Sequence, residues 1–225
     1  MVDFQVSNAQ IFFITDAIDE NLNLSTNFKA LLSSCGNEHT RENLCCKMNS
    51  ELELFVSHLP SWACHFDDDN YVNVMMLEKK LKEFNPKFDW YLGKPSVAEP
   101  IFVHNSYEKV GFQFATGGAG FCLSQSLLIK MRTYLRNSGF ELLGNYLGLP
   151  DDVTLGYLIE HLLNVKLTVI DEFHSHLEPL NISLSGGSYD SDGKNLIDVP
   201  LKFSSATDPH RFRSIHCYIT GRNCV

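Results

Sequence analysis

The sequence lacks the long apolar runs, the net positive charge and the C-x-x-C cysteine spacing that mark several common protein classes. No run of about 18 apolar residues occurs, so no segment is long enough to span a bilayer as a helix. The formal net charge is -9, which argues against binding to nucleic acids or to anionic membranes. No C-x-x-C pair occurs, so the cysteine spacing does not indicate a zinc site.

A signal-peptide start is also lacking, because no basic segment followed by an apolar stretch opens the chain. The chain of 225 residues nevertheless contains seven cysteines, many for a reduced cytosolic domain of this size. Six paired cysteines and one free thiol would fit an oxidising compartment. Glycosylation sequons at Asn23 and Asn181 agree with a secretory location.

Apolar periodicity predicts one domain over residues 1–225, with an α/β fold and a mixed sheet flanked by helices. Short apolar or β-branched runs predict strands at 11–15, 62–66, 89–92 and 165–170. Helical spacing predicts helices at 40–59, 74–84, 125–138 and 151–163. Few periodic signals occur in the expected loops and connections, at 17–25, 95–111, 139–149 and 181–200. Residues 206–225 are expected to form a tail held by a disulfide.

Three adjacent carboxylates, Asp67, Asp68 and Asp69, follow the apolar run that begins at Trp62. Their mutual repulsion calls for a positive charge, and a divalent cation is the simplest candidate; a solvated acidic turn is the alternative. Side chains alternate along a strand, so Asp67 and Asp69 are expected to share one face while Asp68 points away. An EF-hand is excluded, because Val72 instead of glycine occupies the sixth position from Asp67.

Small residues at 116–120 (TGGAG) precede the predicted helix 125–138. The stretch is neither G-x-G-x-x-G nor a Walker loop, since no Lys-Ser/Thr pair follows it. Glycines at Gly117 and Gly118 would let a substrate approach the backbone closely. A tight packing turn is the other interpretation of this stretch.

Two further stretches contain residues suited to acid–base or metal chemistry. Asp151 and Asp152 open a predicted helix, where carboxylates cap the helix and are stabilised by its dipole. The alternative role is that of a general base that stays ionised at neutral pH. His174 and His176 fall on the same side of an extended segment, and imidazole beside carboxylate oxygens would suit Mn²⁺.

Together these features indicate an enzyme that binds a negatively charged donor through a divalent cation, while a separate aspartate deprotonates an acceptor hydroxyl. That is the chemistry of a glycosyltransferase that uses a nucleotide-sugar donor. Six strings across nearly the whole chain resemble the Fringe glycosyltransferases: WACHFDDDNYVN at 62–73, YLGKPS at 91–96, FATGGAGFCLS at 114–124, PDDVTLGY at 150–157, FHSHLE at 173–178 and RFRSIHC at 211–217.

The resemblance implies a GT-A fold and an inverting, Mn²⁺-dependent β-1,3-N-acetylglucosaminyltransferase of the Golgi lumen. Such an enzyme transfers N-acetylglucosamine from UDP-GlcNAc to O-linked fucose on EGF repeats of Notch-type receptors. It also implies roles for individual residues: Asp152 as catalytic base, Asp69 and His176 as metal ligands, and Asp67, Asp68, Gly117 and Gly118 as donor-binding residues. The implied disulfides are Cys35–Cys46, Cys64–Cys122 and Cys217–Cys224, which leaves Cys45 free.

The N-terminal part of the sequence departs from the family pattern. Fringe chains begin with a membrane anchor, a stem and a first strand, whereas residues 11–15 resemble the family's second strand. The chain is therefore expected to be N-terminally truncated relative to the family. Two alternatives remain open: an inactive chain that binds glycosylated EGF repeats or UDP without turnover, and a related β-1,3-galactosyltransferase.

Overall fold

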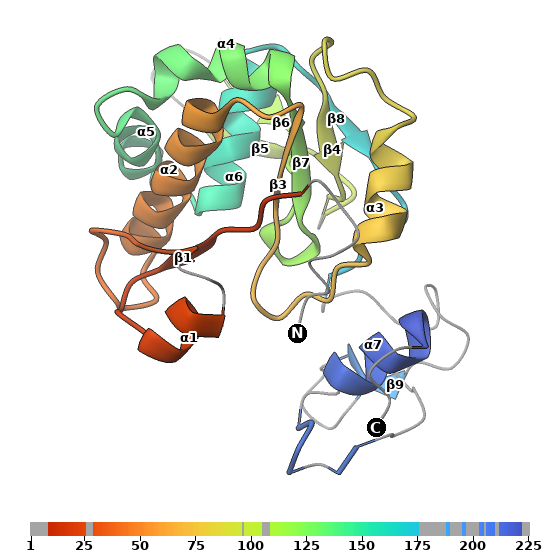
Figure 1. The fold of residues 1–225 in the computed structure, drawn as a ribbon. Coiled ribbons are helices and arrows are strands. Elements are labelled where there is room, and N and C mark those ends of the chain that lie inside the picture. The colour runs from red at the N-terminus through yellow and green to blue at the C-terminus, as the bar shows by residue number, and fades with distance from the viewer. Residues whose placement is uncertain are drawn as a thin grey trace.

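The computed structural model describes residues 9–25, 29–95, 97–104, 109–175, 188–189, 195–196, 203–204, 206–209 and 212–221. A four-stranded sheet in the order β3-β7-β4-β8 forms the centre of the fold (Figure 1). Its strands are Trp62–His65 (β3), Phe121–Ser124 (β7), Tyr91–Gly93 (β4) and Leu167–Val169 (β8). β7 runs antiparallel to both β3 and β4, whereas β4 and β8 are parallel. The predicted mixed sheet is confirmed.

Helices cover both faces of this sheet (Figure 1). One face packs against α2 (Arg41–His58), α4 (Gln125–Leu135), α5 (Gly139–Leu147) and α6 (Asp151–Gly156). The other face packs against α3 (Val74–Leu81). Side chains of successive strand residues point to opposite faces, so Tyr91 joins the first of these cores and Leu92 the second. The sheet with its helices is the α/β arrangement that the sequence predicts.

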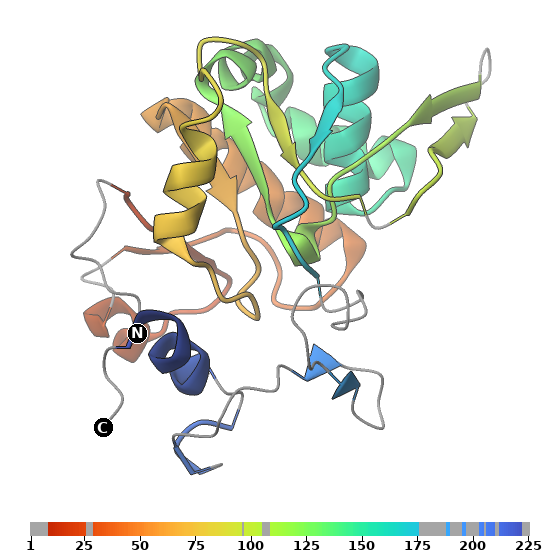
Figure 2. The ribbon, with the colours of Figure 1, turned by 90° about the vertical axis from the view of Figure 1, so that its right-hand side faces the viewer.

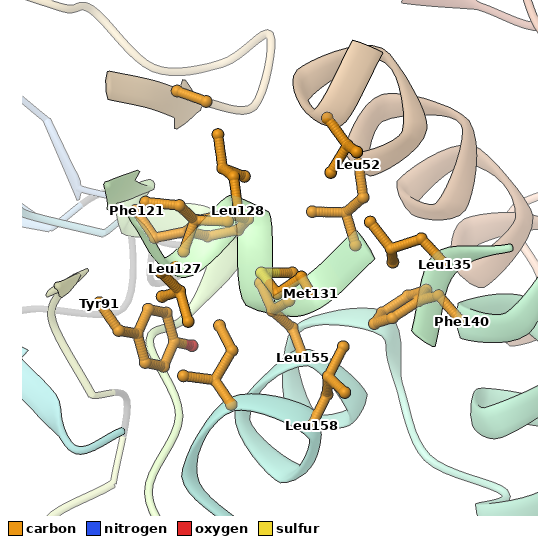
Figure 3. Close-up of a cluster of buried hydrophobic side chains, with 14 of the residues drawn as sticks. Leu52, Tyr91, Phe121, Leu127, Leu128, Met131, Leu135, Phe140, Leu155 and Leu158 are labelled. Atoms are coloured by element: carbon orange, nitrogen blue, oxygen red, sulfur yellow. The ribbon is translucent and has the colours of Figure 1, made fainter. Parts of the chain in front are cut away.

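The larger core lies between the sheet and the helices α2, α4 and α6 (Figure 3). α2 contributes Met48, Leu52 and Val56, whose spacing of four places them on one face of the helix. Tyr91 is fully buried, and its hydroxyl oxygen accepts a hydrogen bond of 2.8 Å from the Ala115 N–H. That bond fixes the backbone immediately before the Gly-rich stretch to the middle of the sheet.

Three stretches without clear periodicity are ordered elements, which corrects the expectation of loops there. Part of 17–25 is the helix α1 (Glu20–Ser25), which Asp19 caps by accepting the Leu22 N–H at 2.9 Å. Residues 139–149 contain α5, and residues 95–111 contain most of a hairpin of β5 (Ile101–His104) and β6 (Lys109–Phe112). The hairpin extends from the body of the protein (Figure 2).

The remaining elements lie outside the central sheet. β1 (Phe13–Thr15) pairs in parallel with β2 (Ala30–Leu32), and β9 (Ser188–Tyr189) pairs with β10 (Asn195–Leu196). After α6 the chain continues as a π-helical segment, Tyr157–Leu162, so the predicted helix 151–163 changes its hydrogen-bond pattern halfway. α7 (Phe212–Thr220) lies within the predicted tail. None of the helices in the described part of the chain is long and apolar enough to cross a membrane.

Two of the three predicted disulfides lie within the described residues and are confirmed. Cys35–Cys46 joins the segment before α2 to that helix, and Cys64–Cys122 joins β3 to β7. Cys217 is disulfide-bonded as well, whereas its expected partner Cys224 lies outside the described residues. Cys45 is a buried free thiol, as predicted.

Candidate functional site

The three carboxylates of the acidic cluster lie in a tight turn that follows β3. The strand ends at His65, and the Asn70 N–H donates a hydrogen bond of 3.1 Å to the Asp67 carbonyl oxygen. Asp68 and Asp69 are therefore the two central residues of a four-residue turn, and both side chains are exposed. The strand-alternation argument for these residues is wrong, because the strand has already ended.

The Gly-rich stretch packs directly against this turn. Gly117–Ala119 form one turn of 3₁₀ helix, and Gly120 has a φ of 81°, which favours glycine. A Cβ on Gly120 would lie 2.3 Å from the Phe66 ring and 2.8 Å from the His65 carbonyl oxygen. This glycine is therefore required for packing, which supports the structural interpretation of the stretch at that position.

Asp152 lies in the first turn of α6 and is fixed by two backbone donors. Its Oδ2 accepts a hydrogen bond of 3.2 Å from the Gly117 N–H, and its Oδ1 accepts one of 2.7 Å from the Val153 N–H. Burial raises the pKa of Asp152 to about 6, and the nearby charge of Asp151 acts in the same direction. The two hydrogen bonds partly oppose the shift, because they favour the ionised form.

Gly117 is the point at which three of the sequence motifs meet. A Cβ built on Gly117 would lie 3.8 Å from Nε2 of His65, 3.9 Å from the Asp152 Cβ and 3.9 Å from Oδ2 of Asp67. The structure thus brings together the predicted site residues Asp67, Gly117 and Asp152. At Gly117 a methyl group would just fit between these groups at ordinary contact distances, unlike the crowding at Gly120.

His65 belongs to the same cluster and was not predicted from the sequence as a functional residue. Its Nδ1 lies 2.8 Å from Oε2 of Glu51 on α2, and its Nε2 lies 3.2 Å from Oδ1 of Asp67. The ring stacks on Phe121 with centroids 4.9 Å apart. A histidine two residues before the acidic cluster was the available signal, but its partner Glu51 lies on a different element.

The comparisons with known proteins agree with these motifs. A family model described as Fringe-like matches residues 3–223. The chain belongs to the Fringe-like family. It is 43% identical over 231 residues to the Fringe glycosyltransferase of Drosophila melanogaster, covering 96% of this chain and 56% of that protein.

Vertebrate relatives give a similar result. The chain is 40% identical to the β-1,3-N-acetylglucosaminyltransferase radical fringe of Notophthalmus viridescens, with 93% of this chain and 57% of the relative covered. It is also 40% identical to lunatic fringe of Homo sapiens, with 92% and 58% covered. The chain thus spans between half and two thirds of the length of these relatives.

Several predicted site residues of this Fringe-like chain are not joined to the cluster by a described contact. Asp69 is exposed in the turn, and its expected partner ligand His176 lies outside the described residues. No group of three or more potential metal ligands is gathered within the part of the chain that is described. The sequon residue Asn23 lies in α1, and Asn181 is outside the described residues.

The C-terminal helix α7 contacts the segment that follows the acidic turn. The Tyr71 hydroxyl lies 2.9 Å from Nδ1 of His216 on α7. At the start of α7, Oδ2 of Asp208 accepts hydrogen bonds from the Ser214 N–H and hydroxyl, at 2.8 and 2.7 Å. Residues 212–217 of the Fringe-like string therefore have a structural role: they belong to α7, which contacts Tyr71, two positions after Asp69.

Proposed function

We propose that this chain carries the catalytic part of an inverting β-1,3-N-acetylglucosaminyltransferase with a GT-A fold, acting in the Golgi lumen. The substrates are UDP-GlcNAc and O-linked fucose on EGF repeats of Notch-type receptors. The observation that carries the proposal is the fixed, partly buried carboxylate of Asp152. Two backbone hydrogen bonds, from Gly117 and Val153, hold this carboxylate beside the acidic turn. The vertebrate relatives named above are β-1,3-N-acetylglucosaminyltransferases, which agrees with this chemistry.

Asp152 is the general base of the proposed reaction. A carboxyl group with a pKa of about 6 is ionised at neutral pH and binds a proton more readily than an ordinary aspartate. It would take the proton of the fucose 3-hydroxyl while that oxygen forms a bond to the anomeric carbon of the donor. The bond from this carbon to the UDP oxygen breaks in the same step, which inverts the anomeric configuration.

The donor is proposed to lie against the acidic turn and the Gly-rich stretch. The lack of side chains at Gly117 and Gly118 would let the donor approach the backbone, while Asp67 and Asp68 accept hydrogen bonds from sugar hydroxyls. The roles proposed for these carboxylates rest on the resemblance of the motif to the Fringe family.

Mn²⁺ is the proposed cofactor, with Asp69 and His176 as its protein ligands. The donor set fits the metal, because an exposed carboxylate oxygen in a turn and an imidazole nitrogen are both suitable ligands for Mn²⁺. When bound, the ion supplies positive charge that offsets the charge of the diphosphate.

A donor screen tests this proposal directly. The purified chain is incubated with Mn²⁺, an O-fucosylated EGF repeat and either UDP-GlcNAc or UDP-galactose, and the product is analysed by mass spectrometry. The expected result is addition of one N-acetylhexosamine that depends on Mn²⁺. Addition of a hexose would instead support a galactosyltransferase. Binding of UDP or the EGF repeat without any product would support a chain that does not turn over its donor.

A further inference from the structure

His65 lies within hydrogen-bond distance of both the acidic turn and the helix α2. It is the last residue of β3, and its side chain is 14% exposed. Stacking on Phe121, with an angle of 16° between the rings, fixes the plane of the imidazole. One ring nitrogen then faces Glu51 and the other faces Asp67.

This geometry determines the protonation of the ring. A carboxylate only accepts hydrogen bonds, and a neutral imidazole has only one N–H to donate. With carboxylate oxygens 2.8 Å from Nδ1 and 3.2 Å from Nε2, both nitrogens carry a proton when both carboxyl groups are ionised. Burial lowers the pKa of His65, but Glu51 and Asp67 outweigh that effect and raise it to about 10. We therefore expect His65 to be an imidazolium at neutral pH.

Asp67 links this cation to the turn. Its side chain accepts the hydrogen bond from His65, while its backbone carbonyl accepts the Asn70 N–H that closes the turn. The same residue thus connects the rigid end of β3 to the segment that presents Asp68 and Asp69. The Asp67 side chain is 46% exposed, so packing alone does not hold it in place.

We propose that His65, held as an imidazolium by Glu51, is a positioning residue that anchors Asp67 and thereby sets the conformation of the turn containing Asp68 and Asp69. This inference rests on the proposed function and deepens it. It names the residue that holds in place the carboxylates proposed to bind the donor and the metal. It also gives Asp67 a specific task.

The surrounding charges agree with a fixed cation at this position. Carboxylates near His65 come from three parts of the fold: Glu51 from α2, Asp67 from the turn, and Asp151 and Asp152 from α6. The positive charge of His65 lowers the pKa of Asp151, although burial raises it overall. A charge fixed by ring stacking would offset part of the repulsion between these groups without a flexible lysine or arginine side chain.

Glu51→Gln tests the role of the charge, with Glu53→Gln as the control because Glu53 is exposed on the same helix. Nitrogen-15 NMR of labelled histidine reports whether both ring nitrogens of His65 carry protons at pH 8. We expect an imidazolium in the wild-type chain and in Glu53→Gln, and a neutral ring in Glu51→Gln. A neutral His65 in the wild-type chain at pH 8 would overturn the proposal.

Amide exchange of Asn70 reports the turn itself, because that N–H closes it. We expect Glu51→Gln to lower the protection of this amide by about fivefold, since a hydrogen bond from a charged donor is roughly twice as strong as one from a neutral donor. Unchanged protection in a folded Glu51→Gln chain that has lost the imidazolium would also overturn the proposal.

Substitutions of the exposed Asp67 provide a second route if Glu51→Gln fails to fold. Asp67→Ala should lose the protection of the Asn70 amide, and Asp67→Asn, which retains an acceptor oxygen, should recover part of it. Equal protection in Asp67→Ala and the wild-type chain would show that the anchor is not needed. None of these measurements uses a sugar donor, so they stand even where the wild-type chain shows no transfer.

Binding of UDP and Mn²⁺ connects the anchor to the proposed function. Calorimetry should show affinity about 10- to 100-fold weaker in Glu51→Gln than in Glu53→Gln, the range expected when the support of a ligand group is removed. Equal affinity in the two variants counts against the anchor. Absence of binding in the wild-type chain counts against the proposed transferase function.

Discussion

The backbone N–H of Gly117 donates a hydrogen bond to the side chain of Asp152, with 3.2 Å between N and Oδ2. The bond joins the 3₁₀ turn of the Gly-rich stretch to the first turn of α6, two motifs that are 35 residues apart in sequence. Because the donor is a backbone group, the position of the proposed base depends on the conformation of the Gly-rich stretch. The candidate site is therefore a property of both motifs together.

Asp152→Asn should abolish transfer while retaining the fold and the binding of UDP and Mn²⁺. Asparagine has nearly the same shape, but it cannot take a proton from the acceptor hydroxyl, and loss of a general base costs about 10²- to 10⁴-fold in rate. Single-turnover transfer and calorimetric binding of UDP–Mn²⁺ would separate the two effects. Glu53→Gln serves as the control, and transfer at the wild-type rate in Asp152→Asn would show that another group is the base.

The rate of transfer should rise with pH and level off above about pH 7, because the proposed base has a pKa of about 6 and acts when ionised. Asp151→Asn should move this rise to lower pH, since the charge of Asp151 contributes to raising the pKa of Asp152. The profile of kcat/KM between pH 4.5 and 8.5 measures both effects. A rise that stays in place or moves to higher pH in Asp151→Asn would contradict the electrostatic coupling.

Much of this fold could be predicted from the sequence because apolar residues recur with a clear period. The helix α2 and the strands β3 and β4 lie close to their predicted ranges, since their buried faces are read directly from such repeats. The helix α5 was missed: Gly139 and Gly144 suggested a connection. Gly144 is there for packing, because a Cβ at this position would lie 2.6 Å from the Cys45 sulfur.

Within the candidate site, the sequence indicated residue types but not the contacts between them. The acidic cluster, the Gly-rich stretch and Asp152 were each recognisable from local patterns, and the structure places Asp67, Gly117 and Asp152 together. The part played by His65 could not be predicted, because it depends on Glu51, a residue of a different element. The turn was not predicted either: the strand predicted at 62–66 is close to β3, but strand alternation was applied to Asp67 and Asp69 beyond its end.

Alanine substitutions at Gly117 and Gly120 should have opposite consequences. In Gly117→Ala the methyl group meets His65, Asp67 and Asp152 at ordinary contact distances, so stability should change by less than about 1 kcal/mol. Transfer should nevertheless fall by roughly 10- to 100-fold, because the methyl group occupies the space between groups proposed to act on the substrates.

Gly120→Ala is the matched contrast to Gly117→Ala. Its positive φ and the 2.3 Å approach to Phe66 predict a loss of about 2–4 kcal/mol in the free energy of unfolding. Urea unfolding and transfer assays on both variants check the pair. Full activity in Gly117→Ala would argue that substrate does not enter the space beside this glycine.

The disulfide Cys64–Cys122 should contribute more to stability than Cys35–Cys46. Cys64 and Cys122 lie directly opposite each other on the antiparallel strands β3 and β7, and their bond closes a loop with a sequence separation of 58, against 11 for the other bridge. In the chain-entropy model this difference corresponds to about 4 kcal/mol for the longer loop and about 3 kcal/mol for the shorter one. Paired alanine variants of each bridge, unfolded in urea, measure the two contributions. Equal or reversed losses would show that native-state packing around the cysteines outweighs loop closure.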